Sequence, residues 1–298
     1  MRGAKFIVFV TALILAFAAS SAQAQSTKFV SVTGSDTNPC DVATPCRTIG
    51  AAITAVAANG RVTILTSGEY APFAVDKAVT VAAADGVDAT IVQAGMPAEA
   101  IRVTAPANTN VVLRGLTILT RLTGTFTYGG RGITTANANL HVEHCVLDGP
   151  FVTAIRISSG RLYVSDTVVR GAMDEEAILQ LGPSEAWYER LHLDSTALIG
   201  LKVESAGARA VVRDSTFMKA NAGVRALGGG NAIIENSGFS LNGVAIAADA
   251  GSRVTVSNSV IANNGTGIGG TGTRVTFGNN RFAGNTTNGT FTITAALR

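Results

Sequence analysis

Four charged residues that could act as acids or bases lie at intervals of 23 or 24 positions, three of them in one outward column of an internal repeat and Asp166 at the bend beside it. They are Glu143, Asp166, Glu189 and Arg213. If each interval advances the chain by one strand spacing, Glu143 and Glu189 stand about 10 Å apart, near the upper limit for the two carboxylates of an inverting glycosidase. The spacing therefore indicates acid–base chemistry on a sugar as one candidate activity.

Aromatic residues recur with the same spacing. Tyr163 follows His141 by 22 positions, and Trp187 follows Tyr163 by 24. Aromatic rings beside carboxylates and guanidinium groups suit a sugar, which has apolar faces and hydroxyl edges. The candidate ligand-binding residues are these rings and the charged residues near them: His141, Tyr163, Trp187, Arg190 and Asp214. The alternative is that these aromatic residues only suit β-strands.

Short strands of an internal repeat must position these residues. Similar six-residue segments, 22, 24, 24, 22, 22 and 21 positions apart, begin at Val142, Val164, Tyr188, Val212, Ile234, Val256 and Phe277. Helical-hairpin repeats need about 33 residues or more, so these intervals fit one coil of a β-solenoid. An Asp or Asn at the third place of most segments favours a bend, and small or polar residues at the fourth place can hydrogen-bond along the solenoid axis.

The repeat predicts an all-β fold, a parallel β-helix of about 22 residues per coil, in which stacked coils bury a continuous core. Ile49, Ile53 and Val56 have a helical spacing, with Thr48 as N-cap and Gly60 just beyond the end. We expect this helix to cover the first coil, and residues 291–294 to form the last strand.

The N-terminal residues predict export. Arg2 and Lys5 precede an apolar stretch that ends at Ala19, and an Ala-x-Ala site ends at Ala24. This pattern is typical of a signal peptide over residues 1–24, cleaved after Ala24. The stretch is shorter than the roughly 20 residues of a membrane span, and no later segment reaches that length. We therefore expect a secreted or periplasmic protein with no membrane span in the mature chain.

The cysteines agree with an oxidising compartment. Cys40 and Cys46 flank a short loop that a disulfide could close, whereas Cys145 has no partner and is expected to be a buried small side chain. With three histidines in the whole sequence, a zinc site is not expected. No linker or charge run interrupts the chain after Ala24. Residues 25–298 therefore form one predicted domain, with an N-terminal cap over 25–60 and coils and a C-terminal cap over 61–298.

Composition limits the partners. Apolar residues make up 47% of the sequence, which excludes intrinsic disorder. Without Arg2 and Lys5 of the signal peptide, 21 of the 23 basic side chains remain against 20 acidic ones. This balance gives no support to nucleic-acid binding, which requires a basic excess. We expect a monomer.

Both ends of the mature chain resemble exported bacterial right-handed parallel β-helix repeat proteins. The resemblance is carried by the segments 29–36, 38–40 and 45–48 at the start, and by 277–282 and 284–291 at the close. It implies the pectate-lyase-like fold with right-handed coils. It implies no activity, because this fold hosts many functions.

Known enzymes with this fold provide motifs to compare. Of the Asn-Thr-Asp, Asp-Asp, Gly-His-Gly and Arg-Ile-Lys motifs of polygalacturonase-like hydrolases, the chain has only Arg156-Ile157-Ser158, without the lysine. Pectate lyases hold calcium with clustered aspartates and use an arginine as base. Adjacent acids occur here only at Asp174-Glu175-Glu176, which we expect on a solvated turn, with calcium binding as the alternative. No cofactor is predicted.

A second outward column is predicted on the neighbouring sheet, with the members Arg156, Gln180, Lys202 and Arg225. It would either meet an acidic polymer or keep the solenoid soluble. The function that the sequence favours is a non-catalytic protein of the cell envelope or exterior that binds a polysaccharide through the Tyr163 and Trp187 face. The alternative is a polysaccharide lyase, hydrolase or epimerase that acts on uronate polymers with the same face.

Overall fold

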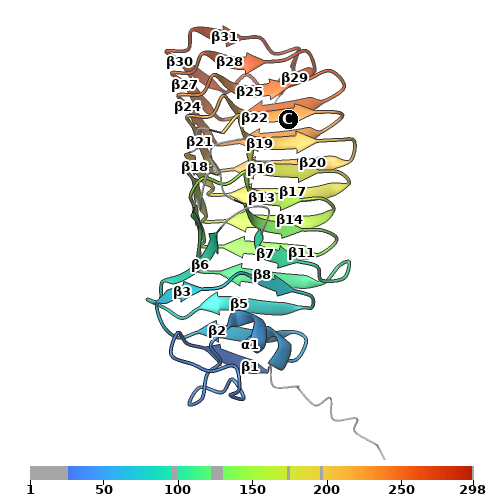
Figure 1. Cartoon of the computed structure of the whole chain (residues 1–298). Coiled ribbons are helices and arrows are strands. Elements are labelled where there is room, and N and C mark those ends of the chain that lie inside the picture. Colours follow the sequence, from blue (N-terminus) through green and yellow to red (C-terminus); the bar gives the residue numbers. More distant parts are fainter. Residues whose placement is uncertain (1–25, 95–98, 122–129, 173–174, 195–196, 297–298) are drawn as a thin grey trace, which may run out of the picture.

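The computed structural model describes residues 26–94, 99–121, 130–172, 175–194 and 197–296. The predicted signal peptide, residues 1–24, lies outside them. The described residues form a parallel solenoid in which every coil contributes strands to sheets that run the length of the molecule (Figure 1). The prediction of a parallel β-helix is confirmed.

Three parallel sheets make up the solenoid, with 12, 10 and 10 strands among the described residues. Sheet 1 contains β1 (Thr27–Val30), β2 (Gly60–Ile64), β5 (Val79–Ala83), β8 (Asn110–Arg114), β11 (Asn139–Glu143), β14 (Gly160–Ser165), β17 (Ser184–Glu189), β20 (Ala208–Arg213), β23 (Asn231–Glu235), β26 (Arg253–Ser257), β29 (Thr273–Thr276) and β32 (Ile293–Thr294). Sheet 2 contains β4 (Phe73–Val75), β7 (Glu99–Val103), β10 (Arg131–Thr135), β13 (Thr153–Ile157), β16 (Glu176–Leu181), β19 (Ile199–Glu204), β22 (Ala222–Leu227), β25 (Val244–Ala248), β28 (Thr266–Gly269) and β31 (Thr287–Gly289). Sheet 3 contains β3 (Gly68–Tyr70), β6 (Ala89–Ala94), β9 (Leu116–Arg121), β12 (Val146–Asp148), β15 (Val168–Arg170), β18 (His192–Asp194), β21 (Thr216–Met218), β24 (Gly238–Ser240), β27 (Val260–Ala262) and β30 (Arg281–Ala283).

The strand register follows the predicted repeat except in the last coil. Val142 pairs with Val164, and Val164 pairs with Tyr188. The inward residues that follow in the same register are Val212, Ile234 and Val256. Val256 then pairs with Thr276 and not with Phe277, so the predicted start of the last segment is one residue too late. The bend moves with it, because Gly278 takes the positive φ of 82° there.

The predicted bend is a corner between sheet 1 and sheet 3. Asp166, Asp214, Asn236 and Asn258 have φ values of 50°, 49°, 49° and 48°. This left-handed backbone is accessible to Asp and Asn at the lowest cost among residues with a side chain. The corner lets each coil turn within one residue, which confirms the bend prediction at these places.

Small polar residues after the corner form a buried hydrogen-bond ladder along the axis. The Ser215 hydroxyl accepts from the Leu191 amide at 3.1 Å, Ser237 from Ser215 at 3.3 Å and Ser259 from Ser237 at 3.2 Å. A second ladder, which the sequence reasoning missed, joins the Asn242 and Asn264 side chains at 3.0 Å. Both ladders satisfy polar groups inside the solenoid, so the apolar core is not interrupted by unpaired amides.

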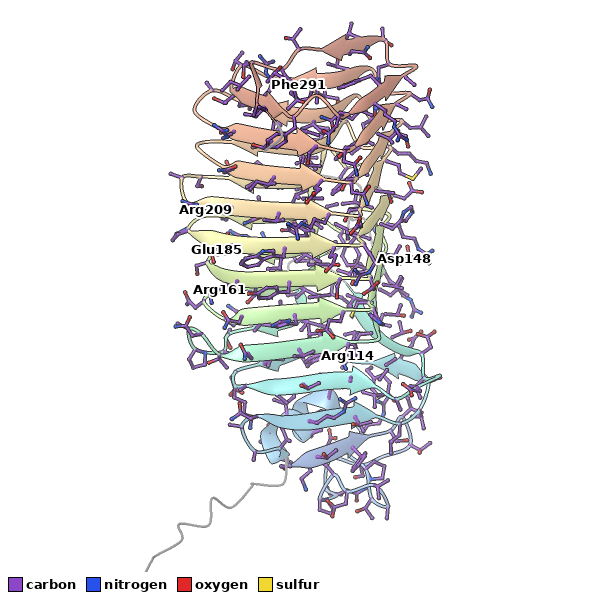
Figure 2. All side chains as sticks on the ribbon, turned by 180° about the vertical axis from the view of Figure 1, so that it is seen from behind. Arg114, Asp148, Arg161, Glu185, Arg209 and Phe291 are labelled. Atoms are coloured by element: carbon purple, nitrogen blue, oxygen red, sulfur yellow. A yellow bond between two sulfur atoms is a disulfide. The ribbon has the colours of Figure 1, made fainter. Side chains whose placement is uncertain are left out.

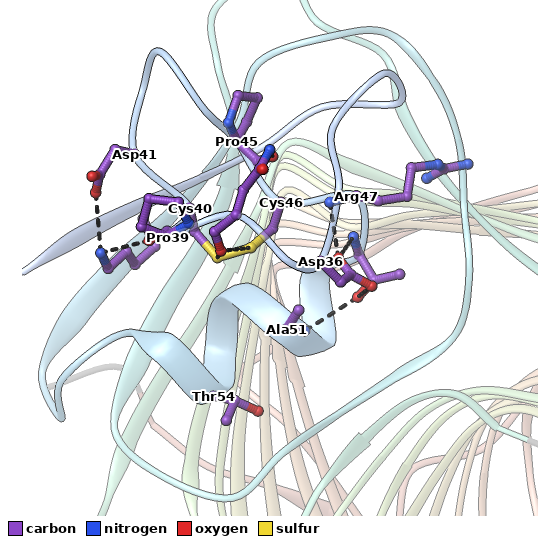
Figure 3. The surroundings of a disulfide bond; sticks show 12 residues. Asp36, Pro39, Cys40, Asp41, Pro45, Cys46, Arg47, Ala51 and Thr54 are labelled. Atoms are coloured by element: carbon purple, nitrogen blue, oxygen red, sulfur yellow. Dashed lines mark hydrogen bonds and ion pairs between the residues drawn. A yellow bond between two sulfur atoms is a disulfide. The ribbon is translucent and has the colours of Figure 1, made fainter.

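The N-terminal end is covered by a helix and a disulfide loop (Figure 3). Helix α1 spans Ile49–Ala55, and the hydroxyl of its N-cap Thr48 accepts from the Ala51 amide. It ends earlier than the apolar spacing predicts, because Val56 is already extended and leads the chain towards β2. The disulfide between Cys40 and Cys46 is present. Next to this loop, the Asp36 carboxylate accepts from the backbone amides at 47 and 48, which joins the loop to the start of the helix.

None of the described helical segments has both the length and the hydropathy of a membrane span. Cys145 is buried and unpaired, and burial raises the pKa of its thiol to about 11. A thiol that stays protonated is a poor nucleophile, which agrees with the predicted structural role.

Candidate functional site

The three aromatic residues singled out from the sequence are stacked on the outer face of sheet 1. His141 pairs with Tyr163 in neighbouring strands, and Tyr163 with Trp187. The ring centroids are 4.5 Å apart for His141 and Tyr163, with planes inclined by 13°. They are 4.7 Å apart for Tyr163 and Trp187, with planes inclined by 6°. Equal register on adjacent parallel strands produces this stack, because it places the three Cβ atoms one strand spacing apart.

Stacking leaves one broad aromatic face free at the C-terminal end of the column. One face of Trp187 lies against Tyr163, and the following residues of the column are the shorter Val211 and Ile233. A recess of about 220 Å³ lies at this step. We call it the Trp187 recess; its lining residues are Glu185, Ala186, Trp187, Arg209, Ala210, Val211, Asn231 and Ile233.

Charged residues border the recess on the side where the strands begin. Figure 2 looks onto sheet 1 and shows Arg161, Glu185 and Arg209 above one another at this edge. Arg161 and Glu185 form an ion pair at 3.2 Å. No described residue forms an ion pair or side-chain hydrogen bond with the Arg209 guanidinium. The recess therefore has a free hydrogen-bond donor group beside an aromatic face.

Asn231 adds a second polar group to the lining. Its side-chain oxygen is buried and accepts no hydrogen bond from the described residues. An amide oxygen without a donor raises the free energy of the folded state, and a donor brought by a ligand would relieve this. Nothing in the residue pattern singled out Asn231, because an asparagine on an outer strand face is common.

The predicted catalytic residues are held in ion pairs. Glu143 accepts from Arg114 at 2.8 Å, and Arg213 lies 3.2 Å from Glu235. Asp166 accepts from the Arg190 guanidinium at 2.6 and 2.8 Å, and Glu189 binds the same guanidinium. Each of the four predicted catalytic residues therefore lies in an ion pair: Glu143, Asp166, Glu189 and Arg213.

Electrostatics oppose acid catalysis by Asp166. The hydrogen bonds from Arg190 hold the pKa of the Asp166 carboxyl below its usual range, so the group is ionised at neutral pH. Partial burial lowers the pKa of His141, although Glu143 at 3.8 Å acts in the opposite direction. His141 is accordingly neutral at pH 7 and serves as the uncharged first ring of the stack.

Two of the predicted ligand-binding residues lie away from the recess. Arg190 and Asp214 occupy the corner between sheets 1 and 3, with φ values of 50° and 49°. Arg190 pairs with Asp166, and Asp214 accepts from the Asn236 side chain. Neither corner residue lines the Trp187 recess. Of the predicted binding residues, Trp187 lines it directly, while His141 and Tyr163 support its ring from behind.

The predicted column on sheet 2 is wrong at Gln180. Leu179 lies in register with Arg156 and Lys202, whereas Gln180 pairs with the inward residues Ile157 and Val203. Gln180 is fully buried and donates to the Arg209 carbonyl at 2.9 Å. The error arises because the connection before β16 is one residue longer than the regular repeat, which shifts the alternation of faces.

The predicted acidic turn at 174–176 is also wrong for Glu176. Asp174 lies outside the described residues, and Glu175 is exposed. Glu176 is the first residue of β16 and is only 6% exposed, with its carboxylate 2.8 Å from the Lys202 ammonium. Glu176 therefore lies in an ion pair on sheet 2 and not on a solvated turn. Across the part of the chain that is described, no cluster of three or more His, Cys, Asp or Glu could hold a metal ion.

A second and larger recess, of about 340 Å³, lies on the outer face of sheet 2. We call it the Leu198 recess; it is lined by Leu198, Ile199, Asn221, Ala222, Arg225, Val244, Ala247, Asp249 and Gly270. Arg225 donates to Asp249 at 2.8 and 3.1 Å, so the charged groups of this recess already satisfy each other.

Comparisons with known proteins agree with the architecture. The family model described as "Right handed beta helix region" matches residues 178–296. Among solved structures, one described as the complex of XylC with xylose aligns with a TM-score of 0.65 and 10% identity, over 84% of this chain and 68% of that chain. The pectate lyase Pel9A aligns with a TM-score of 0.57 and 15% identity, over 89% and 80%.

A third similar structure is the pectin methylesterase from Aspergillus niger. Its TM-score is 0.52 at 14% identity, over 92% of this chain and 91% of that chain. No curated protein matches the sequence. At such identities the likeness concerns the fold alone, which is the right-handed parallel β-helix of the pectate-lyase type.

Proposed function

We propose that this right-handed parallel β-helix protein of the pectate-lyase type binds a polysaccharide at the Trp187 recess and does not cleave it. The observation that carries the proposal is the free face of Trp187 above the short side chains of Val211 and Ile233. Aromatic rings with a polar rim suit sugars, because a pyranose has apolar C–H faces and a rim of hydroxyls.

The lining offers partners for both parts of a sugar. Trp187 with Val211 and Ile233 provides an apolar floor and wall. Arg209 donates hydrogen bonds, and Glu185 accepts them from hydroxyl groups. The unpaired side-chain oxygen of Asn231 accepts one more. Convergence of a few polar groups on an apolar recess is the general form of a small-ligand site.

A binding role without cleavage is supported by the charge pairs. A glycosidase needs one protonated and one ionised carboxyl group, with a space between them for the reacting bond. The Asp166 carboxylate, with its depressed pKa, is tied to Arg190, and Glu143 and Glu189 each have an arginine within hydrogen-bond distance. Each of the three carboxylates therefore already has an arginine partner.

The comparisons support a carbohydrate ligand only through the names of similar folds. The neighbours include a complex with xylose, a pectate lyase and a pectin methylesterase. Export of the mature chain from a signal peptide at 1–24 is part of the same proposal, and the disulfide between Cys40 and Cys46 supports it. A monomer suffices, since one chain supplies every lining residue of the recess.

Binding to a panel of neutral and acidic polysaccharides tests the proposal, with and without calcium. We expect retention of at least one polymer, and loss of at least about tenfold in affinity in Trp187→Ala. Trp187→Phe keeps a ring and should bind with intermediate affinity. Leu198→Ala removes an exposed apolar side chain from the other recess and should bind normally.

Release of oligosaccharides from any polymer in the same panel would contradict the non-catalytic role and favour a lyase, hydrolase or epimerase. Unchanged binding in Trp187→Ala, with a circular dichroism spectrum like that of the wild type, would exclude the Trp187 recess as the site.

A further inference from the structure

We infer that the Trp187 recess accepts one ring of an uncharged glycan whose sugars are linked through equatorial bonds, and that this glycan crosses sheet 1 parallel to its strands. The inference rests on the proposed function and names the ligand class of the same site. Three properties of the recess carry it: its height along the solenoid axis, the orientation of the Trp187 ring and the charges at its two ends.

The height matches one sugar ring. Trp187, Val211 and Ile233 occupy the same register position on three successive strands. Strands about 4.8 Å apart place Trp187 and Ile233 roughly 9.6 Å apart along the axis, with Val211 between them as the floor. A ring that contacts an apolar group on each face needs two contacts of about 4.0–4.5 Å, or about 8–9 Å in total. Ile233 lines the recess with an aliphatic side chain that is 46% exposed, and this side chain is the second wall.

The Trp187 ring fixes the plane of the bound sugar. Its plane is inclined by only 6° to that of Tyr163, which lies beneath it along the axis. The free face of Trp187 therefore points along the solenoid axis, and a sugar stacked on it lies with its mean plane perpendicular to that axis. This plane contains the strand direction and the direction outward from the sheet.

The linkage geometry follows from this plane. Equatorial bonds leave a chair-shaped ring close to its mean plane, so both neighbouring sugars can leave through the open ends of the recess, along the strands. Axial bonds leave perpendicular to the ring and would drive the next sugar into Trp187 or Ile233. Val211 forms the floor of the recess, so the glycan cannot continue towards the sheet. An extended glycan can therefore leave the recess only along the strands.

The ends of the recess favour hydroxyls over carboxylates. Glu185 and Arg209 lie where the strands begin, and Glu189, Arg213 and Glu235 lie in the column where they end. Together with Arg161, which pairs with Glu185, the two ends carry three carboxylates and three guanidinium groups, so they offer a chain of uronates no excess of positive charge. Carboxylates and guanidinium groups of both signs can instead accept from and donate to neutral hydroxyls.

Titration calorimetry with four hexasaccharides tests the inference. The probes are cellohexaose and mannohexaose, which are neutral and equatorially linked at both ends of each ring, maltohexaose, which is neutral with an axial bond, and hexagalacturonate, which is charged with axial bonds. We expect an equatorially linked probe to bind at least about tenfold more tightly than maltohexaose and hexagalacturonate.

Ile233→Ala removes the second wall and should reduce this preference to less than about threefold, because an axially linked neighbour then has room. Leu198→Ala is the matched control, since it shortens an exposed aliphatic side chain of the Leu198 recess, just before β19, and it should leave the preference unchanged. Thermal unfolding of both variants checks that the solenoid is intact.

Two results would overturn the inference in different ways. Equal or tighter binding of maltohexaose or hexagalacturonate, lost in Trp187→Ala, would refute the ligand class and leave the proposed function standing. Absence of any binding that depends on Trp187, among the hexasaccharides and the polysaccharide panel alike, would remove both.

Discussion

The Trp187 recess on sheet 1 and the Leu198 recess on sheet 2 differ in size and in the chemistry of their linings. The Leu198 recess is larger, about 340 Å³ against 220 Å³, but its lining contains no aromatic ring, and its Arg225 is paired with Asp249. The Trp187 recess has a flat indole face, and within the described part of the chain its Arg209 has no ion pair and its Asn231 amide oxygen has no donor. Both arise in the same way, where long side chains of an outward column are followed by short ones.

The volume of a recess on a solenoid depends on how side-chain length changes along an outward column. The volume therefore does not indicate whether the recess binds a ligand. The chemistry of the recess depends on whether the surrounding charges are free. On sheet 2 Lys202 pairs with the buried Glu176, and Arg225 pairs with Asp249. On sheet 1 the column edge is exposed, and the Arg209 guanidinium beside Trp187 has no ion pair with the described residues. Charges on sheet 2 should therefore matter for stability, and those beside Trp187 for binding.

The largest effect is expected for Lys202→Met. This change leaves the Glu176 carboxylate, 6% exposed, without its nearest cation. Removing one member of a buried ion pair costs about 3–5 kcal/mol, and the free energy of unfolding from urea titration should fall by that order. Arg225→Met is the control, because its pair with Asp249 is more exposed than that of Lys202 with Glu176 and should contribute less than about 1 kcal/mol. Equal losses in the two variants would contradict the assignment of a structural charge to Lys202.

The second effect concerns Val211→Trp, which continues the aromatic stack by one strand. The new ring should cover the free face of Trp187 and fill the floor of the recess, so polysaccharide affinity should fall at least about tenfold while the fold is kept. Affinity electrophoresis in polysaccharide gels measures the loss. Ala247→Val, which reduces the Leu198 recess instead, should bind as the wild type does. Stronger retention of Val211→Trp would mean that the ligand stacks elsewhere on the column.

A smaller effect is expected for Arg209→Ala. Loss of one hydrogen bond from a charged donor at the edge of the recess should weaken binding by about 1.5 kcal/mol or less, which is up to about tenfold. Arg161→Ala is a close control, because Arg161 lies in the same edge column but does not line the recess. Calorimetry should give the larger loss for Arg209→Ala, and the reverse order would remove Arg209 from the site.

The smallest effect concerns pH and the corner pair of Asp166 with Arg190. Because the pKa of Asp166 is lower in the folded protein than in the unfolded chain, its contribution to stability is present above about pH 4 and is lost as the pH falls through the folded value. Thermal midpoints should thus decline slightly more below pH 4 in the wild type than in Asp166→Asn. An opposite difference, or a change near neutral pH, would show that the pair is not the titrating unit.

Sequence reasoning located the fold and the aromatic column because both follow from a repeat of nearly constant length. Tyr188 and Val212 are 24 positions apart, and equal spacing places neighbouring residues of the column together on the same face. Where the spacing changed, the reasoning was wrong. The connection before β16 has one additional residue, so Gln180 points inward. The last coil has one residue fewer, so Thr276 and not Phe277 pairs with Val256.

The recess itself could not be deduced from residue types. A column of aromatic residues predicts a sugar-binding face, yet Tyr163 has both of its ring faces covered by its neighbours. Trp187, the last ring, has one face that no further ring covers, and this face lines the recess. Pairing of Glu143, Glu189 and Asp166 with arginines depended likewise on side-chain orientations across strands, which the order of residues along the chain does not specify.

By itself, the sequence determined the architecture of the protein, since the period of apolar and bend residues allows each coil to bury its inward side chains only against the next coil. It also determined which residues share a column, because the register of stacked parallel strands follows from the number of residues in each coil. The tertiary structure decided which of those side chains are free to meet a ligand. That depends on the lengths and orientations of neighbours one strand away, and these are fixed only when the coils pack.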